Sequence, residues 1–390
     1  GTTAMPADIR YYEGSGKDEE YIDYILAAAA HRVRSIDEIW FEDSLAWSAT
    51  GGVQGEYVGY LTAVTARTEG TASNTIAING GTRWGADDRL TGCAYIRLRI
   101  KRTGKTDKEQ SPLVSGMPGR VTVIGEGMPM YDPRFDSTVG GDGPMRIDDQ
   151  STWGESSENP IIQSLNVLLG WRINGKLSVG GGLPPKYINL DSAITAANIC
   201  DEDIALSSGG SQKRYRGAGA FSTNDAPMDI VAALLAGCAG DLLDCDGQLS
   251  FLIKTNTLAT PAVTFDDHDV VSGASWDPMG GQTNIPNIVA GSFTDPSSLY
   301  QMPPFPSVSL PSEDGIDRVA RIDFATVENA ARAERLAKQT LQRMQYSGTF
   351  TAEYNMKGMA ATIGSIVWQT YSPLGWINKP FRGGSQKPSR

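Results

Sequence analysis

Histidine and paired cysteines are scarce in this chain of 390 residues. It has two histidines, His31 and His268, and four cysteines that lie far apart and form no Cys-x-x-Cys pair, namely Cys93, Cys200, Cys238 and Cys245. A Ser-His-Asp or Cys-His mechanism must therefore use one of the two histidines. Cys238 and Cys245 flank a predicted helix end and a strand, so a disulfide between them stays open. Buried free thiols, as in a protein assembled in the cytoplasm, are what we expect.

The chain also lacks a long apolar run and an excess of positive charge. No stretch of about 18 apolar residues occurs, so the sequence predicts no membrane-spanning helix. The formal net charge is −11, which argues against a surface that coats DNA. Two interpretations of this acidity remain open. A negative channel wall would let DNA slide past without sticking, and a net charge of either sign also aids solubility.

Glycine and proline, in contrast, are abundant. The chain has 44 glycines and 21 prolines, which is typical of a β-rich protein with frequent turns. We predict a first β-rich domain over residues 1–135, a mixed α/β middle module over 136–255, a second β-rich domain over 256–382 and a linker over 383–390. Because the chain begins at Gly1, we expect a longer polypeptide in which the start of the first domain lies upstream.

Hydrophobic periodicity predicts the main elements. Alternation and apolar runs predict strands, listed by residue number: 21–30, 36–41, 57–67, 95–101, 119–124, 261–271, 285–293, 350–355 and 363–371. Helical spacing predicts helices over 160–169, 191–201 and 326–346. Thr326 is the expected cap of the last helix, and its basic face is expected either to contact an acidic neighbouring subunit or to be solvated. The prolines of 295–311 predict an extended arm or a long loop.

Residues 213–253 predict a strand, a helix and a hairpin, with a turn signal at each joint. The strand is expected over 213–216, and Asp225-Ala-Pro227 is expected to start the helix. Gly237 and Gly240 are expected to close it after an apolar stripe of Met228, Ile230, Val231, Leu234 and Leu235. Asp246-Gly247 favours a type I′ turn between two apolar strands. The unit has few residues able to do chemistry, so we expect its role to be structural, in packing against other parts of the protein.

Two loop motifs resemble ligand sites only in part. Gly104-Lys-Thr106 resembles the end of a phosphate-binding loop, but Arg99 stands where the first glycine of that motif belongs. Asp241, Asp244 and Asp246 have the wrong spacing for a calcium loop, and a hairpin turn explains Asp246-Gly247 without a metal. We therefore expect neither a nucleotide nor a calcium site here.

Acidic pairs and tryptophans are the other candidates for chemistry. Asp87-Asp88 and Asp148-Asp149 suit glycoside cleavage, although acid pairs are common in loops. The turn Asp266-Asp-His-Asp269 suits a metal or catalytic cluster, and its plainer interpretation is a solvated turn. The tryptophans are scattered, and a carbohydrate platform would need several on one face: Trp40, Trp47, Trp84, Trp153, Trp171, Trp276, Trp368 and Trp376. We predict no catalytic, cofactor-binding or metal-binding residues and no enzymatic activity.

Six landmarks follow one another along the chain: Arg89-Leu-Thr-Gly-Cys-Ala-Tyr95, Tyr131-Asp-Pro-Arg134, Asn159-Pro-Ile-Ile162, Asp191-Ser-Ala-Ile-Thr-Ala-Ala-Asn-Ile-Cys-Asp-Glu202, Arg214-Tyr-Arg216 with its helix and hairpin, and Asn287-Ile-Val-Ala-Gly-Ser-Phe-Thr-Asp-Pro296. In these landmarks and their order the chain resembles the tip attachment protein J family. Its members are the central tail hubs of long-tailed, siphovirus-type bacteriophages and of gene transfer agents. The resemblance covers roughly residues 36–382.

The resemblance implies a mainly β, multi-domain fold with an α/β insert and tail-tube-like β-barrel hub domains. It implies a structural virion protein of the tail tip or baseplate, a homotrimeric hub that closes the distal end of the tail tube. Such a hub adapts a sixfold tube to a threefold tip and gates the tape measure protein and DNA ejection. The implied partners are the distal tail protein or tube ring, the tape measure protein, other tip or fibre proteins, DNA in transit and the host envelope during attachment. No cofactor is implied.

Two other functions remain open from the sequence. A virion-associated polysaccharide hydrolase would need acid pairs and tryptophans to converge in a cleft. A receptor-binding β-adhesin without a channel role would behave as a stable monomer or as a trimer without a bore.

Overall fold

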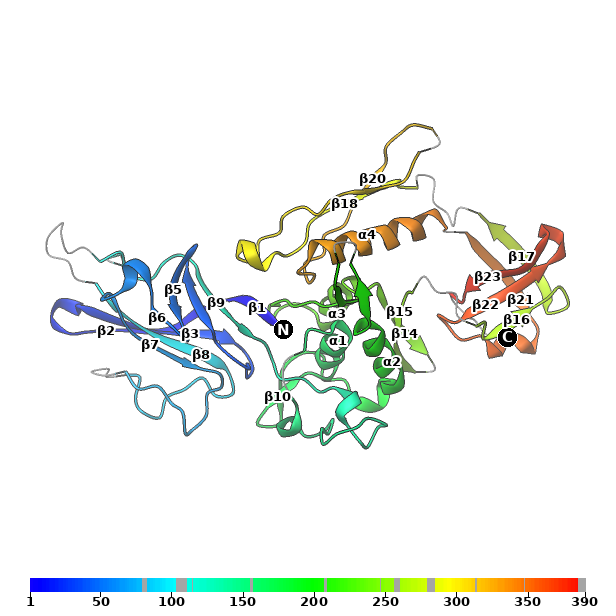
Figure 1. Cartoon of the computed structure of the whole chain (residues 1–390). Helices are drawn as coiled ribbons and strands as arrows, with labels where there is room; N and C mark the ends of the chain where they lie inside the picture. The colour runs from blue at the N-terminus through cyan, green and yellow to red at the C-terminus, as the bar shows by residue number, and fades with distance from the viewer. Residues whose placement is uncertain are drawn as a thin grey trace. The chain divides into compact units, whose positions relative to one another are not determined.

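A computed structural model describes residues 1–78, 83–102, 111–113, 115–154, 157–206, 209–245, 247–255, 260–278, 285–312, 314–346 and 348–384 (Figure 1). The described chain is mainly β and multi-domain, which confirms the predicted fold class. Two compact units divide it. The first consists of Gly1–Pro184, Arg216–Leu234 and Asp295–Gln301, and the second of Pro185–Tyr215, Leu235–Thr294 and Met302–Arg390. The division into three domains stays a prediction.

Two antiparallel sheets make up the N-terminal part of the first unit. Their strand orders are β1-β9-β4-β5-β6 and β2-β3-β8-β7. The strands are β1 Thr2–Pro6, β2 Asp8–Ser15, β3 Tyr21–Ala29, β4 Glu38–Phe41, β5 Ser44–Ser48, β6 Gly52–Val53, β7 Leu61–Arg67, β8 Ala94–Lys101 and β9 Val121–Glu126. The strands predicted over 21–30, 36–41 and 95–101 are thereby confirmed. The strand predicted from residue 57 begins at Leu61, because Gly55–Tyr57 forms a 3-10 turn.

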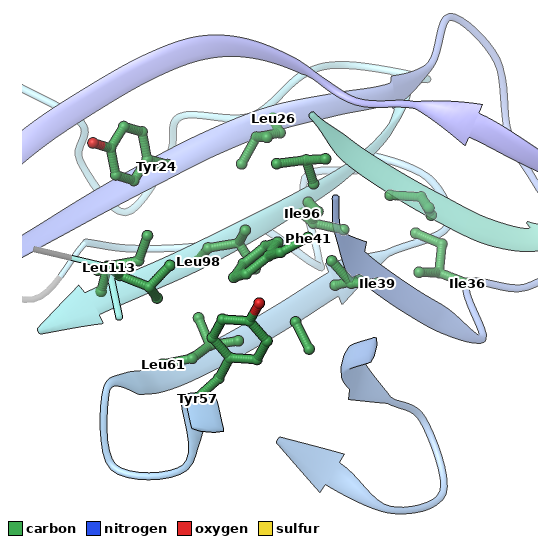
Figure 2. Close-up of a cluster of buried hydrophobic side chains, with 14 of the residues drawn as sticks. Tyr24, Leu26, Ile36, Ile39, Phe41, Tyr57, Leu61, Ile96, Leu98 and Leu113 are labelled. Carbon is green, nitrogen blue, oxygen red and sulfur yellow. The ribbon is translucent and has the colours of Figure 1, made fainter. Parts of the chain in front are cut away.

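The apolar faces of the two sheets share one core (Figure 2). Ile39 and Phe41 of β4 lie in it with Leu26 of β3 and Leu98 of β8, and each is at most 1% exposed. Alternation explains this pattern, because every second side chain of a strand points to the same face. The rings of Phe41 and Tyr57 meet edge to face, with centroids 5.1 Å apart.

The opposite face of β3 and β8 is also covered, and it holds an ion pair. Ile25 and Tyr95 pack there against Ile76 and Ile78. Asp23 is fully buried, and its carboxylate accepts a hydrogen bond of 2.8 Å from Nε of Arg97. A second nitrogen of Arg97 lies 2.7 Å from the same oxygen, and Nη1 of Arg97 donates to the carbonyl of Ala77.

The remainder of the first unit is built around α1 Pro160–Leu169. Asn159 caps this helix by accepting a bond from the N–H of Ile161, so the predicted start is confirmed. A hairpin of β10 Trp171–Ile173 and β11 Lys176–Val179 follows. α3 Pro227–Ala236 begins at the predicted proline, but Met228 of the expected apolar stripe is 52% exposed. Positive φ after this helix occurs at Ala239, and Gly240 already belongs to β14.

The second unit joins short sheets to two helices. The elements of its first part are α2 Leu190–Cys200, β12 Asp203–Ala205, β13 Ser211–Lys213, β14 Gly240–Cys245 and β15 Gln248–Ile253. β14 and β15 form the predicted hairpin. A sheet of order β19-β18-β20 follows, with β18 Ile288–Ala290, β19 Val308–Ser309 and β20 Val319–Arg321. α4 Ala330–Gln345 packs on β18 and β19.

Two further sheets form the C-terminal part of the second unit. One has the order β16-β22-β23, with β16 Val263–Phe265, β22 Ile366–Tyr371 and β23 Trp376–Arg382. The other pairs β17 Val270–Asp277 with β21 Thr349–Tyr354. The single strand predicted over 261–271 is thus two strands, because Asp266 to Asp269 form a turn held by their own side chains. No helix in the described residues is long and apolar enough to cross a bilayer.

Two other predictions are corrected, and one open alternative is decided. The strand expected over 213–216 ends at Lys213, and Tyr215 instead enters the core with 1% exposure. The last helix is capped by Asn329, whose side chain accepts bonds from the N–H groups of Ala331 and Arg332, while Thr326 is buried before it. Of the two alternatives for residues 295–311, the structure has the long loop and not the arm, because the N–H of Phe305 donates back to the carbonyl of Gly291.

Candidate interaction surfaces

The landmark Tyr131-Asp-Pro-Arg134 forms a buried polar joint. The Tyr131 hydroxyl donates a hydrogen bond of 2.8 Å to the carboxylate of Asp136, and both residues are fully buried. Asp136 also accepts bonds from the N–H and hydroxyl of Thr138 and lies 3.2 Å from Nη1 of Arg146. Because every partner is supplied by the same segment, the landmark fixes a backbone path and offers no free acid for chemistry.

Asn166 connects this joint to α1. Its side-chain oxygen accepts from the N–H of Tyr131, and its amide donates to the carbonyl of Tyr131, both at 2.8 Å. The same amide donates to the carbonyl of Ile162 inside the helix. Asn166 is fully buried, so two landmarks of the sequence meet through one side chain.

The stability of the joint is expected to fall in acid. Burial raises the pKa of Asp136, but bonds from Thr138 and Tyr131 and the charge of Arg146 outweigh it, so the net pKa lies below the usual value. A lowered folded-state pKa contributes stability above the unfolded value of about 4, which is lost as the pH falls through the folded one. Urea unfolding from pH 7 to pH 3 should therefore show the difference between wild type and Asp136→Asn shrinking below about pH 4.

The control for this measurement is Asp142→Asn, at an exposed aspartate of the same segment. Its difference from wild type should be small at every pH. A difference for Asp136→Asn that stays constant down to pH 3 would contradict the assignment of this carboxylate as the acid-sensitive group.

The segment around the landmark Arg214-Tyr-Arg216 holds α4 in place. The buried hydroxyl of Tyr215 donates to the side chain of Gln339 at 2.9 Å. Arg335 donates to the carbonyl of Arg214, and Arg343 donates to the carbonyl of Lys254 at 2.6 Å. Burial lowers the pKa of both guanidinium groups. Two arginines of the predicted basic face are therefore anchored in their own chain. For Arg332 and the exposed Lys338, contact with a neighbour or solvation stays a prediction.

The acidic turn around His268 holds loops together. Asp267 accepts bonds from the N–H and the hydroxyl of Ser372. Asp269 accepts from the side chain of Asn355 at 3.1 Å and from Lys357 at 2.7 Å. These carboxylates are thus occupied in tying the 266–269, 355–361 and 372–374 loops.

The other candidate residues lie apart. Asp88 accepts from the N–H of Gly85 and Asp149 from that of Ser151, so each caps a local turn. Burial lowers the pKa of His31, whose Nδ1 faces the carbonyl of Arg32. The four cysteines are free thiols, with Cys200 and Cys238 buried. No group of three or more His, Cys, Asp or Glu able to hold a metal occurs among the described residues. Gly104 to Thr106 and Asp246 lie outside them.

Aromatic rings gather between the two C-terminal sheets. Trp276 and Trp376 meet edge to face with centroids 4.9 Å apart, and Phe350 and Phe381 lie next to them. The ammonium of Lys379 lies 4.4 Å from the Trp276 centroid and 4.1 Å from that of Trp376. All of these side chains are only partly buried. Trp153 and Trp171 form a second pair, 5.7 Å apart, in the first unit.

Exposed apolar side chains concentrate in the same C-terminal part of the second unit. Val271, Met356, Met359 and Ile377 are 66, 79, 71 and 82% exposed. Met356 and Met359 are three residues apart in the 3-10 helix Met356–Ala360, a spacing that places both on one side. Contiguous patches of exposed apolar side chains mark surfaces that meet other macromolecules, so these residues are candidates for such a surface. The sequence analysis did not single out these residues. No local signal marks them, because the equally uncharged run Asn287 to Phe293 holds a fully buried valine, Val289.

One family model and two solved structures are similar to this chain. Residues 226–367 match the model of the Phage-tail_3 family, described as "Putative phage tail protein". A chain in the virion of a native gene transfer agent particle is similar at a TM-score of 0.59 and 12% identity, over 98% of this chain and 80% of that one. The 43 kDa tail protein of prophage MuSo2 from Shewanella oneidensis is aligned over 98% of this chain and 87% of that one, at 11% identity and a TM-score of 0.28. That likeness is too low to carry an argument. No curated protein matches the chain.

The family match covers about a third of the chain. The similarity to the gene transfer agent chain shows a shared fold. Together they support a structural protein of a phage tail or of a related particle.

Proposed function

We propose that the chain is the subunit of a homotrimeric hub that closes the distal end of a phage tail tube. The observation that carries this proposal is the shared fold, over 98% of the chain, with a chain in the virion of a native gene transfer agent particle. The match of residues 226–367 to a phage tail family supports it independently. In this proposal the protein belongs to the tip of the virion and does no catalysis.

The arrangement of β-rich parts suits a change of symmetry. One chain carries two sheets near its N-terminus and two more near its C-terminus. Three copies of a chain with two β-rich parts would present six such parts around an axis, which matches a sixfold tube above and a threefold tip below. Obligate rings of this kind bury more than about 2,000 Å² per interface.

The mechanism that follows is conformational. The hub would hold back the tape measure protein and open on contact with the host envelope, so that this protein and then DNA pass through. A net charge of −11 suits a bore that does not retain the phosphate backbone. The distal tail protein or tube ring and other tip or fibre proteins are the proposed neighbours.

Native mass spectrometry followed by negative-stain imaging tests the proposal. The expected result is a species of about 125 kDa for three copies of 41.8 kDa, and a ring with a central bore. A stable monomer at micromolar concentration, or a trimer without a bore, would contradict the hub. Either outcome would direct attention to receptor-binding and glycan-cleavage assays.

A further inference from the structure

Strand β17 lies at the edge of a two-stranded sheet. It pairs with β21 on one side, and no strand of the described chain pairs with the other. Residues 271–275 are all exposed. An edge of this kind presents a row of free N–H and C=O groups, which is a template for another strand.

Natural edges are usually blocked by charges, proline or bulges. β17 has no proline and a single charge, Asp277 at its last position, together with register shifts between Val270 and Ser275. The edge strand β23 carries Lys379 and Pro380, which are two of the usual devices. From Val270 to Trp276, β17 has only apolar, small or hydroxyl side chains. Copies of a chain with net charge −11 repel one another, so an uncharged strand is a favourable place for them to meet.

Strand β2 has the properties of a donor for this edge. It is the outer strand of its sheet and has eight residues, as β17 has. A bulge at Arg10 pairs Ile9 with Leu26 and Tyr12 with Tyr24, so Ile9 and Tyr12 lie on the face that these two core residues occupy. Ile9 is nevertheless 47% exposed and Tyr12 68% exposed. β2 therefore extends an apolar face beyond the core that it borders.

We propose that β17 of one copy accepts β2 of a neighbouring copy as an added strand. Like charges placed opposite each other destabilise a sheet, so the register must keep Asp8 away from Asp277, the one charge of β17. Arg10 and Glu13 meet no charge from Val270 to Trp276. β2 belongs to the first unit and β17 to the second, so the contact is head to tail and closes a ring when repeated by rotation. The inference rests on the proposed function only in requiring several copies.

The test compares two lysine substitutions at equally exposed valines. Val271 is 66% exposed and Val58, in a turn, is 62% exposed, so neither change should unfold the subunit. Val271→Lys is expected to weaken self-association by about tenfold or more, because it places a charge in the strand pairing, while Val58→Lys associates as wild type does. Analytical ultracentrifugation measures both. Amide hydrogen exchange should slow at residues 8–15 and 270–277 together in assembled wild type, and at neither in Val271→Lys.

The outcomes separate this inference from the hub. Unchanged assembly of Val271→Lys, or protection of residues 270–277 without 8–15, overturns the strand addition and leaves a trimeric ring standing. If the wild-type assembly lacks threefold symmetry and Val271→Lys fails to assemble, the strand addition is supported and the hub is contradicted. A wild-type chain that stays monomeric, with both strands exchanging fast, contradicts both.

Discussion

Asp23→Ala is expected to cost about 3–5 kcal/mol of the free energy of unfolding. The reason is that the guanidinium of Arg97, with 9% of its side chain exposed, would lose the carboxylate that neutralises it. Arg99 would lose the same partner, which it meets at 3.5 Å. Urea unfolding followed by circular dichroism measures the loss. The double variant Asp23→Leu/Arg97→Met should lie nearer to wild type than either single change, because it removes both buried charges.

The matched control is the exposed pair Arg10 and Asp8, whose side chains keep 56 and 74% of their surface in water. Asp8→Ala should change stability by at most about 1 kcal/mol, since solvent screens such a pair. If Asp23→Ala cost no more than Asp8→Ala, the ion pair between β3 and β8 would not be the buried interaction described above.

Asn166→Ala is expected to cost about 2–6 kcal/mol, because it leaves the N–H and the carbonyl of Tyr131 buried without partners, at roughly 1–3 kcal/mol each. The loss should appear in urea unfolding at neutral pH. It should be accompanied by changed near-ultraviolet dichroism from Trp153, whose ring lies 6.1 Å from that of Tyr131.

Asn224→Ala provides the comparison, since Asn224 is exposed in a turn of the same unit. Its effect should stay within about 0.5 kcal/mol. Equal stabilities of the two variants would show that the Tyr131 backbone finds other partners and that the joint does not depend on Asn166.

The elements that could be predicted are those whose start or turn is determined by residues adjacent in the sequence. α1 begins at Pro160 because Asn159 caps it, and both residues are adjacent in the sequence. The hairpin of β14 and β15 follows from two short apolar runs and the turn dipeptide between them. The hairpin of β10 and β11 had an equally local signal, Asn174-Gly175 with both φ angles positive, and was missed although Asn-Gly is a strong turn former.

Long-range contacts explain the rest. The alternation around Tyr215 resembles a strand, but its hydroxyl is held by Gln339, 124 positions away, and tertiary contacts of that kind override local propensity. β23 was missed because Pro380 is unusual in a strand, and it is tolerated here on a sheet edge. The candidate surface depends on which apolar residues stay exposed. Val271 and Val289 are both valines of predicted strands, yet only one is buried, and the sequence carries no signal that separates them.

The buried joints have a consequence for how such a subunit evolves. Tyr131, Asn166 and Tyr215 belong to the landmarks or hold them, and each is at most 1% exposed. A change at any of them is penalised inside the subunit, before any partner is met. Val271 and Met356 are under no such internal constraint, because most of their surface lies in water. A lineage built on this frame can therefore exchange one partner for another by surface substitutions while the frame itself stays constant.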